Sequence, residues 1–198
     1  MKKTFSIKNL TRIAILGTIG GILMIIDFPI FIAPSFYKLD IGDLPCLIGA
    51  FAMGPVSGLF IQIIKILVKL LFKPTSTAFV GEIAAFIFSS TYCLVASIIY
   101  QKNRNKRGAN IAIIIGSLSM ILVSAIANYY FIIPFYSRLY NMPLEAIISL
   151  GSAIFPIIDS LFMFVICCVV PFNIVKVAII DVLTMLLYKR IAPLLRDK

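Results

Sequence analysis

Long runs of apolar residues alternate with short polar breaks along the chain, and no polar stretch exceeds about ten residues. A membrane-spanning helix needs roughly 20 predominantly apolar residues. The pattern predicts six spans, at about 10–27, 43–53, 55–72, 80–100, 111–133 and 160–190. The expected fold is therefore an all-α integral membrane protein, a single domain formed by a compact bundle of six transmembrane helices.

Composition excludes a soluble globule. Of the 198 residues, 61% are hydrophobic and 13% are charged, and the mean hydropathy is +1.08. An average soluble domain is roughly 45–50% apolar and about 25% charged. No polar stretch is long enough to fold as a separate soluble domain beside the spans.

Positive charges gather in three clusters. The net charge is +10, and twelve of the 18 basic residues lie at the N-terminus, in one loop and at the C-terminus. They are Lys2, Lys3, Lys8, Arg12, Lys102, Arg104, Lys106, Arg107, Lys189, Arg190, Arg196 and Lys198. The positive-inside rule places all three clusters, and so both termini, in the cytoplasm. The charge therefore indicates topology and not nucleic-acid binding.

The same rule decides the last third of the chain, which hydropathy alone leaves ambiguous. An even number of crossings must separate the basic loop from the basic C-terminus, and the span at 111–133 supplies one of them. We therefore assign 137–158 to an outer, partly helical loop lying on the surface. The rest is one long final crossing, in which Pro171 starts or kinks the regular helix.

Three polar side chains share one face of the span at 55–72, because Gln62, Lys65 and Lys69 are spaced at i, i+3 and i+7. A lysine at the centre of the bilayer costs about 2.5–3.5 kcal/mol, so it should face protein or water. We expect Lys65 to pair with an acidic residue inside the bundle. The candidate partners are Asp27, Asp43 and Glu82. For Lys69 we expect the side chain to extend toward the near membrane surface.

Small residues recur at three- and four-residue steps in the first span: Ala14, Gly17, Thr18 and Gly21. Such spacing lets another helix backbone approach closely. That helix can belong to this chain or to a partner subunit, and the spacing favours neither.

A polar loop follows the first span. Lys38, Asp40 and Asp43 lie within six residues, with Gly42 and Pro45 as turn-formers. A polar segment between hydrophobic spans is tolerated where protein buries it or water reaches it. The loop is therefore either the lid or wall of a binding cavity or an exposed connector.

Polar residues near the outer ends of two later spans are candidates for ligand binding. Asn128 stands beside three aromatic residues, and Asn173 and Lys176 share one helix face. Amide and ammonium groups can recognise the edge of a flat heteroaromatic ring, while Phe and Tyr contact its faces. The alternative is that Asn173 and Lys176 form a structural pair at an unwound helix start.

Motifs in the same part of the chain carry a family resemblance. They are FYKLDIGDLPCLIGAFAMGPVSG at 36–58, Gln62–Lys65, Asn128–Tyr129, Pro134–Tyr136 and Pro171–Lys176. In this order they resemble the riboflavin-specific S components of energy-coupling factor vitamin transporters, over most of the chain. The resemblance implies a six-helix fold in which Asn128, Asn173 and Lys176 contact the flavin. It also implies that the first loop, with Lys38, Leu39 and Asp40, closes over the ligand. Asp159 is a further candidate, for the ribityl hydroxyls.

The resemblance also implies partners and a location. S components of this family sit in the bacterial plasma membrane, capture their vitamin outside, and work with a transmembrane coupling subunit and two ATPase subunits. This chain has no GxxxxGK[ST] motif, so it cannot hydrolyse ATP through a P-loop. The family docks on the coupling subunit through an Ala-xxx-Ala pattern, whose positions here are Ala14 and Thr18. No cofactor or metal is expected; riboflavin is the transported ligand, with flavin mononucleotide as a second candidate.

Other functions predict different features. An S component for another vitamin would not bind riboflavin. A membrane-embedded enzyme needs an acid/base cluster, but the eight acidic residues show no paired-carboxylate motif and histidine is absent, so we expect no enzyme. A structural or assembly protein would tolerate the loss of Asn173 or Lys176. The four cysteines lie in apolar segments without metal-ligand spacing and are expected to be small buried hydrophobes.

Overall fold

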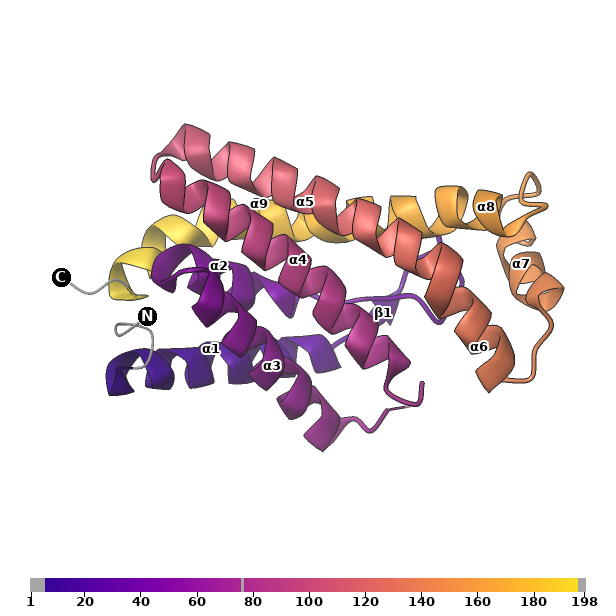
Figure 1. Ribbon diagram of the computed structural model, residues 1–198, viewed down its shortest axis with the longest axis horizontal. Coiled ribbons are helices and arrows are strands. Elements are labelled where there is room, and N and C mark those ends of the chain that lie inside the picture. Colours follow the sequence, from indigo (N-terminus) through magenta and orange to yellow (C-terminus); the bar gives the residue numbers. More distant parts are fainter. Residues whose placement is uncertain (1–5, 76, 196–198) are drawn as a thin grey trace.

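Nearly the whole chain is helical in the computed structural model, which describes residues 6–75 and 77–195 (Figure 1). The elements are α1 (Ile7–Ile25), β1 (Phe28–Pro29), β2 (Lys38–Leu39), α2 (Asp43–Met53), α3 (Pro55–Phe72), α4 (Val80–Lys102), α5 (Lys106–Ala127), the π-helix η1 (Asn128–Ile132), α6 (Ile133–Leu139), α7 (Leu144–Ser152), α8 (Leu161–Phe164), the π-helix η2 (Val165–Val169) and α9 (Val170–Leu195).

Five described segments are long and apolar enough to cross a membrane: Ile7–Ile25, Pro55–Phe72, Val80–Lys102, Lys106–Leu139 and Leu161–Tyr188. The predicted span at 43–53 forms α2 with the predicted bounds. Eleven residues of helix reach only about 16 Å, against a bilayer core of about 30 Å. Nine of these eleven residues are buried. Within the described chain, α2 is therefore an inner helix of the bundle and is too short to cross a bilayer alone.

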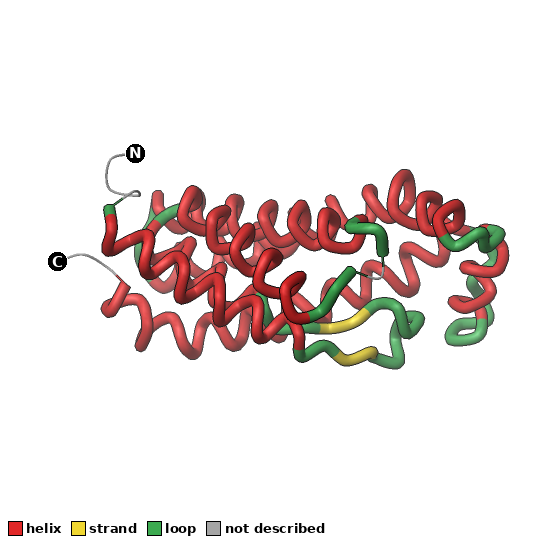
Figure 2. The backbone as a smooth tube through the Cα atoms, turned by 90° about the horizontal axis from the view of Figure 1, so that it is seen from below, coloured by secondary structure: helices red, strands yellow, loops and turns green. Residues whose placement is uncertain are grey.

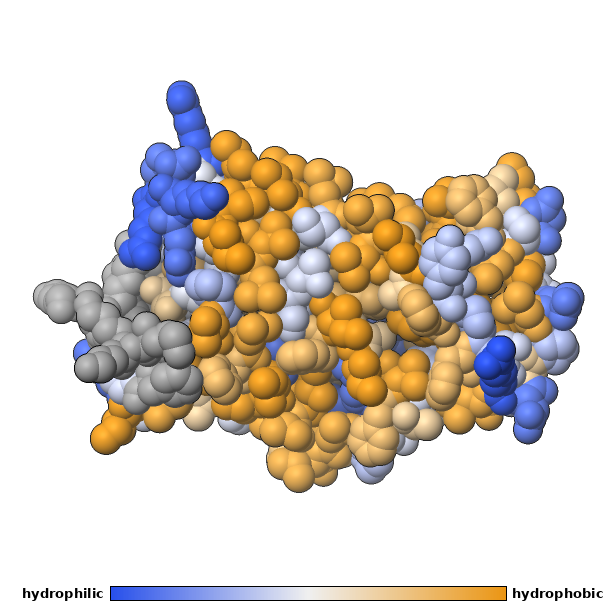
Figure 3. Space-filling model, viewed as in Figure 1, coloured by the Kyte–Doolittle hydropathy of each residue, from blue (hydrophilic) through white to orange (hydrophobic). Residues whose placement is uncertain are grey.

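Polar residues gather at the two ends of the elongated molecule. The start of α1, the end of α9 and the turn between α4 and α5 lie at one end, and α6, α7 and α8 lie at the other (Figure 1). In the space-filling view, hydrophilic surface marks both ends and mainly hydrophobic surface lies between them (Figure 3). We call the two ends the terminal end and the α7 end. An apolar belt between polar ends is the surface expected of a protein embedded in a bilayer.

The core has two hydrophobic clusters, one toward each end. The cluster toward the terminal end combines residues of α1, α2, α3, α4, α5 and α9, and the aromatic rings of Phe51 and Tyr100 are stacked 4.6 Å apart. The cluster toward the α7 end joins the first loop to η2 and its neighbours, and includes Leu39, Phe164 and Phe172. The apolar core is therefore divided into two clusters and is not one continuous mass.

In the last third of the chain, one long helix follows a loop, while the side of the membrane that this loop faces stays a prediction. The loop between α6 and α8 contains the short helix α7, and Leu161–Tyr188 is one continuous apolar helix. This helix widens into the π-turn η2 immediately before α9, in which Pro171 is the second residue. Proline clashes with the preceding turn of a regular helix and lacks an N–H donor, and a π-turn relieves both constraints.

The same arrangement occurs in the preceding long helix. Its π-turn η1 comes directly before α6, in which Pro134 is the second residue. The sequence pattern predicted a regular span at 111–133, whereas the helix runs over 106–139 with η1 inside it. The extra length carries the helix toward the α7 end.

The first loop contains a short hairpin that the apolar pattern did not predict. Strands β1 and β2 pair in antiparallel fashion, with Phe28 opposite Leu39 and Pro29 opposite Lys38. Figure 2 shows this hairpin lying along the side of the helices. Two residues per strand are too few to produce a recognisable alternation. The hairpin holds the chain from Phe36 to Asp40 against the bundle.

Small residues of α1 face two directions. A Cβ added to Gly17 or Gly21 would lie 2.6 Å from a side chain of α3, Ile64 or Val68 respectively, so these glycines permit close packing of α1 on α3. Ala14 and Thr18, by contrast, are exposed. Of the two uses considered for this stripe, internal packing accounts for the glycines and leaves Ala14 and Thr18 available on the outer surface.

Candidate functional site

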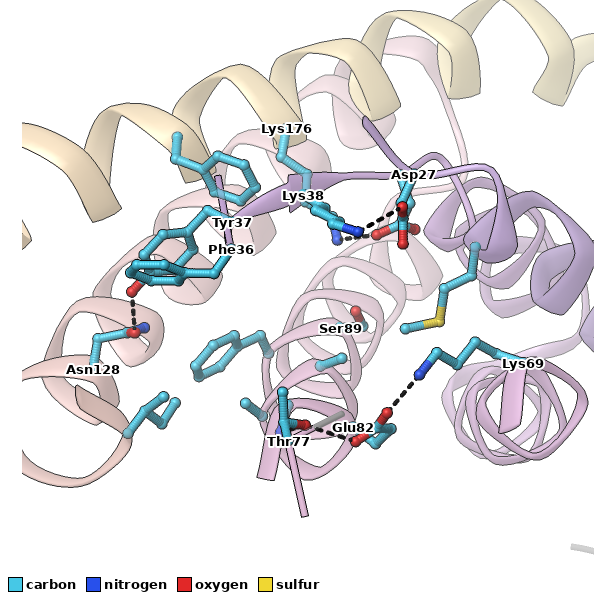
Figure 4. Close-up of a pocket in the computed structure, with 18 of the residues that line it drawn as sticks. Asp27, Phe36, Tyr37, Lys38, Lys69, Thr77, Glu82, Ser89, Asn128 and Lys176 are labelled. Carbon is cyan, nitrogen blue, oxygen red and sulfur yellow. Dashed lines mark hydrogen bonds and ion pairs between the residues drawn. The ribbon is translucent and has the colours of Figure 1, made fainter. Parts of the chain in front are cut away.

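A cavity of about 440 Å³ opens between the first loop, α3, α4, η1 and α9. Its volume is within the range of roughly 300–1,000 Å³ typical of small-molecule sites. Its polar lining residues include Asp27, Tyr37, Lys38, Asp40, Lys69, Lys73, Thr77, Glu82, Ser89, Asn128, Tyr136, Asn173 and Lys176. Apolar faces come from Phe36, Phe88, Met120, Ile132 and Phe172. Figure 4 shows several of these side chains, among them Tyr37, Glu82 and Asn128, extending into the cavity from segments far apart in the sequence.

The two asparagines are held in the same way. Asn128 Nδ2 donates to the carbonyl of Ser124 at 2.8 Å, and Asn173 Nδ2 donates to the carbonyl of Val169 at 2.9 Å. Each bond returns to the residue four positions earlier, beside a π-turn that disturbs the regular backbone pattern. Because the amide nitrogens are used in this way, each asparagine offers its carbonyl oxygen as an acceptor.

Tyr37 joins the first loop to Asn128. Its hydroxyl donates to Asn128 Oδ1 at 2.7 Å, and its ring packs 5.4 Å from that of Phe172. Burial, and then the neighbouring Tyr136 and Cys168, raises the pKa of the Tyr37 phenol well above its usual range. The hydroxyl therefore stays protonated and remains a donor. An amide oxygen has two lone pairs, so Asn128 can still accept a second hydrogen bond.

Lys176 belongs to a buried network of alternating charges. Its Nζ lies 2.9 Å from Asp40 Oδ2 and 3.4 Å from Asp43 Oδ2. Asp43 is completely buried, and its Oδ1 lies 2.5 Å from Lys65 Nζ. The expected internal partner of Lys65 is therefore confirmed, and it is Asp43. Two lysines and two carboxylates balance, which offsets part of the cost of burying each charge.

A second polar group lines the cavity on the side of α3 and α4. Lys69 Nζ lies 2.5 Å from Glu82 Oε1, and the hydroxyls of Thr75 and Thr77 donate to Glu82 Oε2 at 2.9 and 3.2 Å. The prediction that Lys69 extends to the membrane surface is wrong, because its side chain is only 12% exposed and reaches this carboxylate. The first turn of α4 places Glu82 within reach, which the spacing on α3 alone did not reveal.

The rim of the cavity carries another ion-pair group. Asp27, just beyond α1, lies 2.5 Å from Lys73 Nζ and 3.5 Å from Lys38 Nζ. These pairs are more exposed than the internal ones, with Lys38 46% exposed. They connect the end of α1, the hairpin and the end of α3 at the mouth of the cavity.

The predicted site residues fall into three groups. Five of the six proposed ligand contacts line the cavity: Lys38, Asp40, Asn128, Asn173 and Lys176. Leu39 is 1% exposed and packs in the cluster toward the α7 end, behind the lining. Asp159 is exposed and is not among the lining residues. Of the two alternatives for the polar loop, its placement beside the cavity favours a lid or wall.

Sequence reasoning did not single out several lining residues. Phe36 and Tyr37 appeared only as part of a motif, and Glu82 only as a possible partner for a lysine. Tyr136 and Phe172 stand beside the prolines that follow the two π-turns, which was the available signal. In the described part of the chain, no three His, Cys, Asp or Glu residues are grouped to hold a metal ion.

A polar-lined cavity inside a bundle of apolar helices defines a membrane-embedded protein that binds a small molecule. The family of ECF transporter substrate-specific components matches residues 8–188. The chain belongs to this family, whose members are substrate-binding components of transporters and not enzymes.

Individual relatives agree with this assignment. The riboflavin transporter RibU of Staphylococcus aureus (strain TCH60) is 31% identical over 189 residues, which is 96% of this chain and 93% of the relative. The riboflavin transporter FmnP of Bacillus subtilis (strain 168) is 25% identical over 188 residues, covering 94% and 93%. A solved S component of a bacterial ECF transporter superposes with a TM-score of 0.72 at 30% identity, covering 95% of this chain and 97% of the other.

Proposed function

We propose that this chain captures riboflavin from outside the cell and delivers it for ATP-driven uptake. The observation that carries the proposal is the set of groups at one side of the cavity, where two amide oxygens and one ammonium group lie among aromatic rings. The relatives' names as riboflavin transporters support the choice of vitamin.

The pattern of donors and acceptors suits the imide edge of the isoalloxazine ring. That edge has one N–H donor between two carbonyl acceptors. Asn128 and Asn173 supply acceptors for the N–H, and Lys176 supplies a donor for a carbonyl. Phe36, Tyr37 and Phe172 give apolar faces against which the planar ring packs.

The ribityl chain then extends toward the opposite side of the cavity. Lys69, Thr77, Glu82 and the rim residues offer donors and acceptors there. Flavin mononucleotide is a second ligand for this arrangement, because lysines at the rim can pair with a phosphate. The exposed Asp159 is left as a candidate only for a ribityl chain that reaches past the lining.

We place the protein in the plasma membrane of a bacterium, with both termini in the cytoplasm and α2 counted as the sixth helix of the bundle. The positive-inside rule supports this orientation, because the turn at 102–107 lies at the same end of the molecule as the start of α1 and the end of α9 (Figure 1). The cavity then faces outward. A transmembrane coupling subunit, docking at Ala14 and Thr18, and two ATPase subunits supply the energy of transport.

Titration of the purified protein with riboflavin tests this function. Flavin fluorescence in detergent should be quenched to saturation, and the protein should carry flavin absorbance when it is purified from cells. Asn173→Ala and Lys176→Ala should each weaken binding by about tenfold or more, because each removes a polar contact in a desolvated site. Both variants should remain folded by size-exclusion chromatography.

An exposed substitution provides the control. Ile114 is exposed on the surface of α5, so the Ile114→Ala variant should bind riboflavin as the unmodified protein does. A colourless protein that leaves riboflavin fluorescence unchanged, while binding another vitamin, would show instead an S component for that vitamin.

A further inference from the structure

Lys176 lies close to two carboxylates. Contact between Lys176 and a ligand does not by itself require them. Its Nζ lies 2.9 Å from Asp40 Oδ2 and 3.4 Å from Asp43 Oδ2, and its side chain is 12% exposed. An ammonium group has three N–H donors. Lys176 donates one hydrogen bond to Asp40, while Asp43 is a more distant ion-pair partner, so N–H donors remain for the cavity that Lys176 lines.

The two carboxylates are held very differently. Asp43 stands in the first turn of α2, is completely buried, and accepts from both Lys65 at 2.5 Å and Gln62 at 3.3 Å. Its position is therefore fixed by the helix bundle. Asp40 belongs to the first loop, and its other oxygen accepts from the nearby backbone N–H of Gly42 at 2.9 Å. Its bond to Lys176 links residues 136 positions apart in the chain.

The charges also balance. Lys65 and Lys176 carry two positive charges and Asp40 and Asp43 two negative ones, so this side of the cavity has no net charge to attract an anion. A balanced ammonium acts as a hydrogen-bond donor to a neutral carbonyl. Burial at this depth makes the loss of one member costly for its partner.

We propose that Asp40 is a positioning residue, whose carboxylate aims the Lys176 ammonium at the flavin carbonyl and holds the first loop closed over the bound ligand. Asp43, supported by Lys65, stays in place beside Lys176. Asp40 moves away from Lys176 when the first loop opens. Opening the loop then removes a carboxylate from Lys176 at the same time as it uncovers the ligand. This inference rests on the proposed function for its ligand, but the contact itself exists without one.

The dissociation rate of riboflavin tests this role. Asp40→Asn keeps the shape of the side chain and should raise the dissociation rate about tenfold, because it removes the charge from a desolvated bond. Lys176→Gln should raise it at least as much. In the double variant the rate should equal that of Lys176→Gln, because Asp40 acts through Lys176. Glu145→Gln, the matched control, removes an exposed carboxylate that does not line the cavity and should leave the rate unchanged.

A readout without ligand separates this role from the proposed function. Hydrogen exchange of the backbone amides at 36–42 in the unliganded protein should be about tenfold faster in Asp40→Asn and in Lys176→Gln, and unchanged in Glu145→Gln. Failure of the unmodified protein to bind riboflavin would refute the function, and the exchange measurement would still decide on the contact. Unchanged exchange in Asp40→Asn, or effects of the two substitutions that multiply in the double variant, would overturn the positioning role.

Discussion

Among the residues that the structure describes, the three lysines with the most buried side chains each pair with a carboxylate. Lys65 pairs with Asp43, Lys69 with Glu82, and Lys176 with Asp40. A single charge in an apolar environment would cost several kcal/mol, and pairing with hydrogen bonds recovers most of that cost. The pairs therefore determine which helices lie beside one another at the level of the cavity.

Removing one member of such a pair should be more damaging than removing both. We expect Lys69→Met to destabilise the protein by about 3 kcal/mol, because Glu82 is left buried without its cation. The double variant Lys69→Met/Glu82→Met should be less destabilised than the single one. Thermal unfolding in detergent, followed by circular dichroism, measures both. Equal melting temperatures for the single variant and the unmodified protein would contradict the pairing.

Tyr37 offers a milder test at the same scale. Its hydroxyl fixes the orientation of the Asn128 amide from the first loop. Tyr37→Phe keeps the ring and its packing on Phe172 but removes one hydrogen bond, so riboflavin affinity should fall about two- to tenfold. Fluorescence titration measures the change. Tyr130→Phe is a suitable control, because Tyr130 is 65% exposed and does not line the cavity; an equal loss there would refute the role of Tyr37.

Among the helices, α1 shows how one element serves two surfaces. Gly17 and Gly21 face α3, where there is no room for a side chain, and Ala14 and Thr18 face outward. In the proposed function, the outward residues Ala14 and Thr18 dock on the coupling subunit. The two faces can therefore be tested separately.

Substitutions on the two faces of α1 should affect different properties, assembly for the outward face and stability for the face toward α3. Ala14→Leu or Thr18→Leu should leave riboflavin binding by the isolated subunit unchanged and reduce co-purification with the coupling subunit, because bulk prevents close helix approach. Gly17→Leu should instead lower the melting temperature of the isolated subunit by several degrees, since its Cβ would lie 2.6 Å from Ile64. Pull-down and thermal unfolding distinguish them. Normal assembly of both outward variants would place the docking surface elsewhere.

At the scale of elements, the sequence predicted where helices begin and end better than it predicted irregular turns within them. The bounds of α2 and α3 agree with prediction, because Gly54 has a φ of +106° and Pro55 begins the next helix. The π-turns were not predicted, although Pro134 and Pro171 mark both of them. Hydropathy averages over several residues and does not register one additional residue in a turn.

The described part of the molecule has two halves, one toward the terminal end and one toward the α7 end, each with its own apolar cluster. The cavity lies between the hairpin and the helices, beside the cluster toward the α7 end. A ligand that orders the first loop should therefore stabilise the half toward the α7 end and leave the other half unchanged.

Limited digestion with trypsin tests that division inside one molecule. Lys38 stands in the first loop with its side chain 46% exposed, and Arg104 and Lys106 stand in the turn between α4 and α5 at the other end. Saturating riboflavin should slow cleavage after Lys38 at least fivefold and leave cleavage after Arg104 unchanged, as mass spectrometry of the fragments will show. Equal protection at both sites would indicate that the molecule responds as a single unit.

The candidate site was predictable as a set of residues and less so as a geometry. Asn128, Asn173 and Lys176 could be named from polar residues in apolar spans, and Asp43 as one of three partners for Lys65. The bonds of Tyr37 to Asn128 and of Asp40 to Lys176 join residues 91 and 136 positions apart. Only the packing of helices in three dimensions selects such partners, and no local spacing encodes them.

The burial of α2 has a mechanical consequence. From Leu44 to Phe51 this short helix has no charged residue, and every residue in that stretch is buried among the neighbouring helices. This packed segment separates the cavity from the terminal end, so a vitamin bound in the cavity has no open channel through the protein. Release on the other side of the membrane therefore requires that the whole subunit reorients or that its helices separate. The energy for either motion has to come from outside this chain.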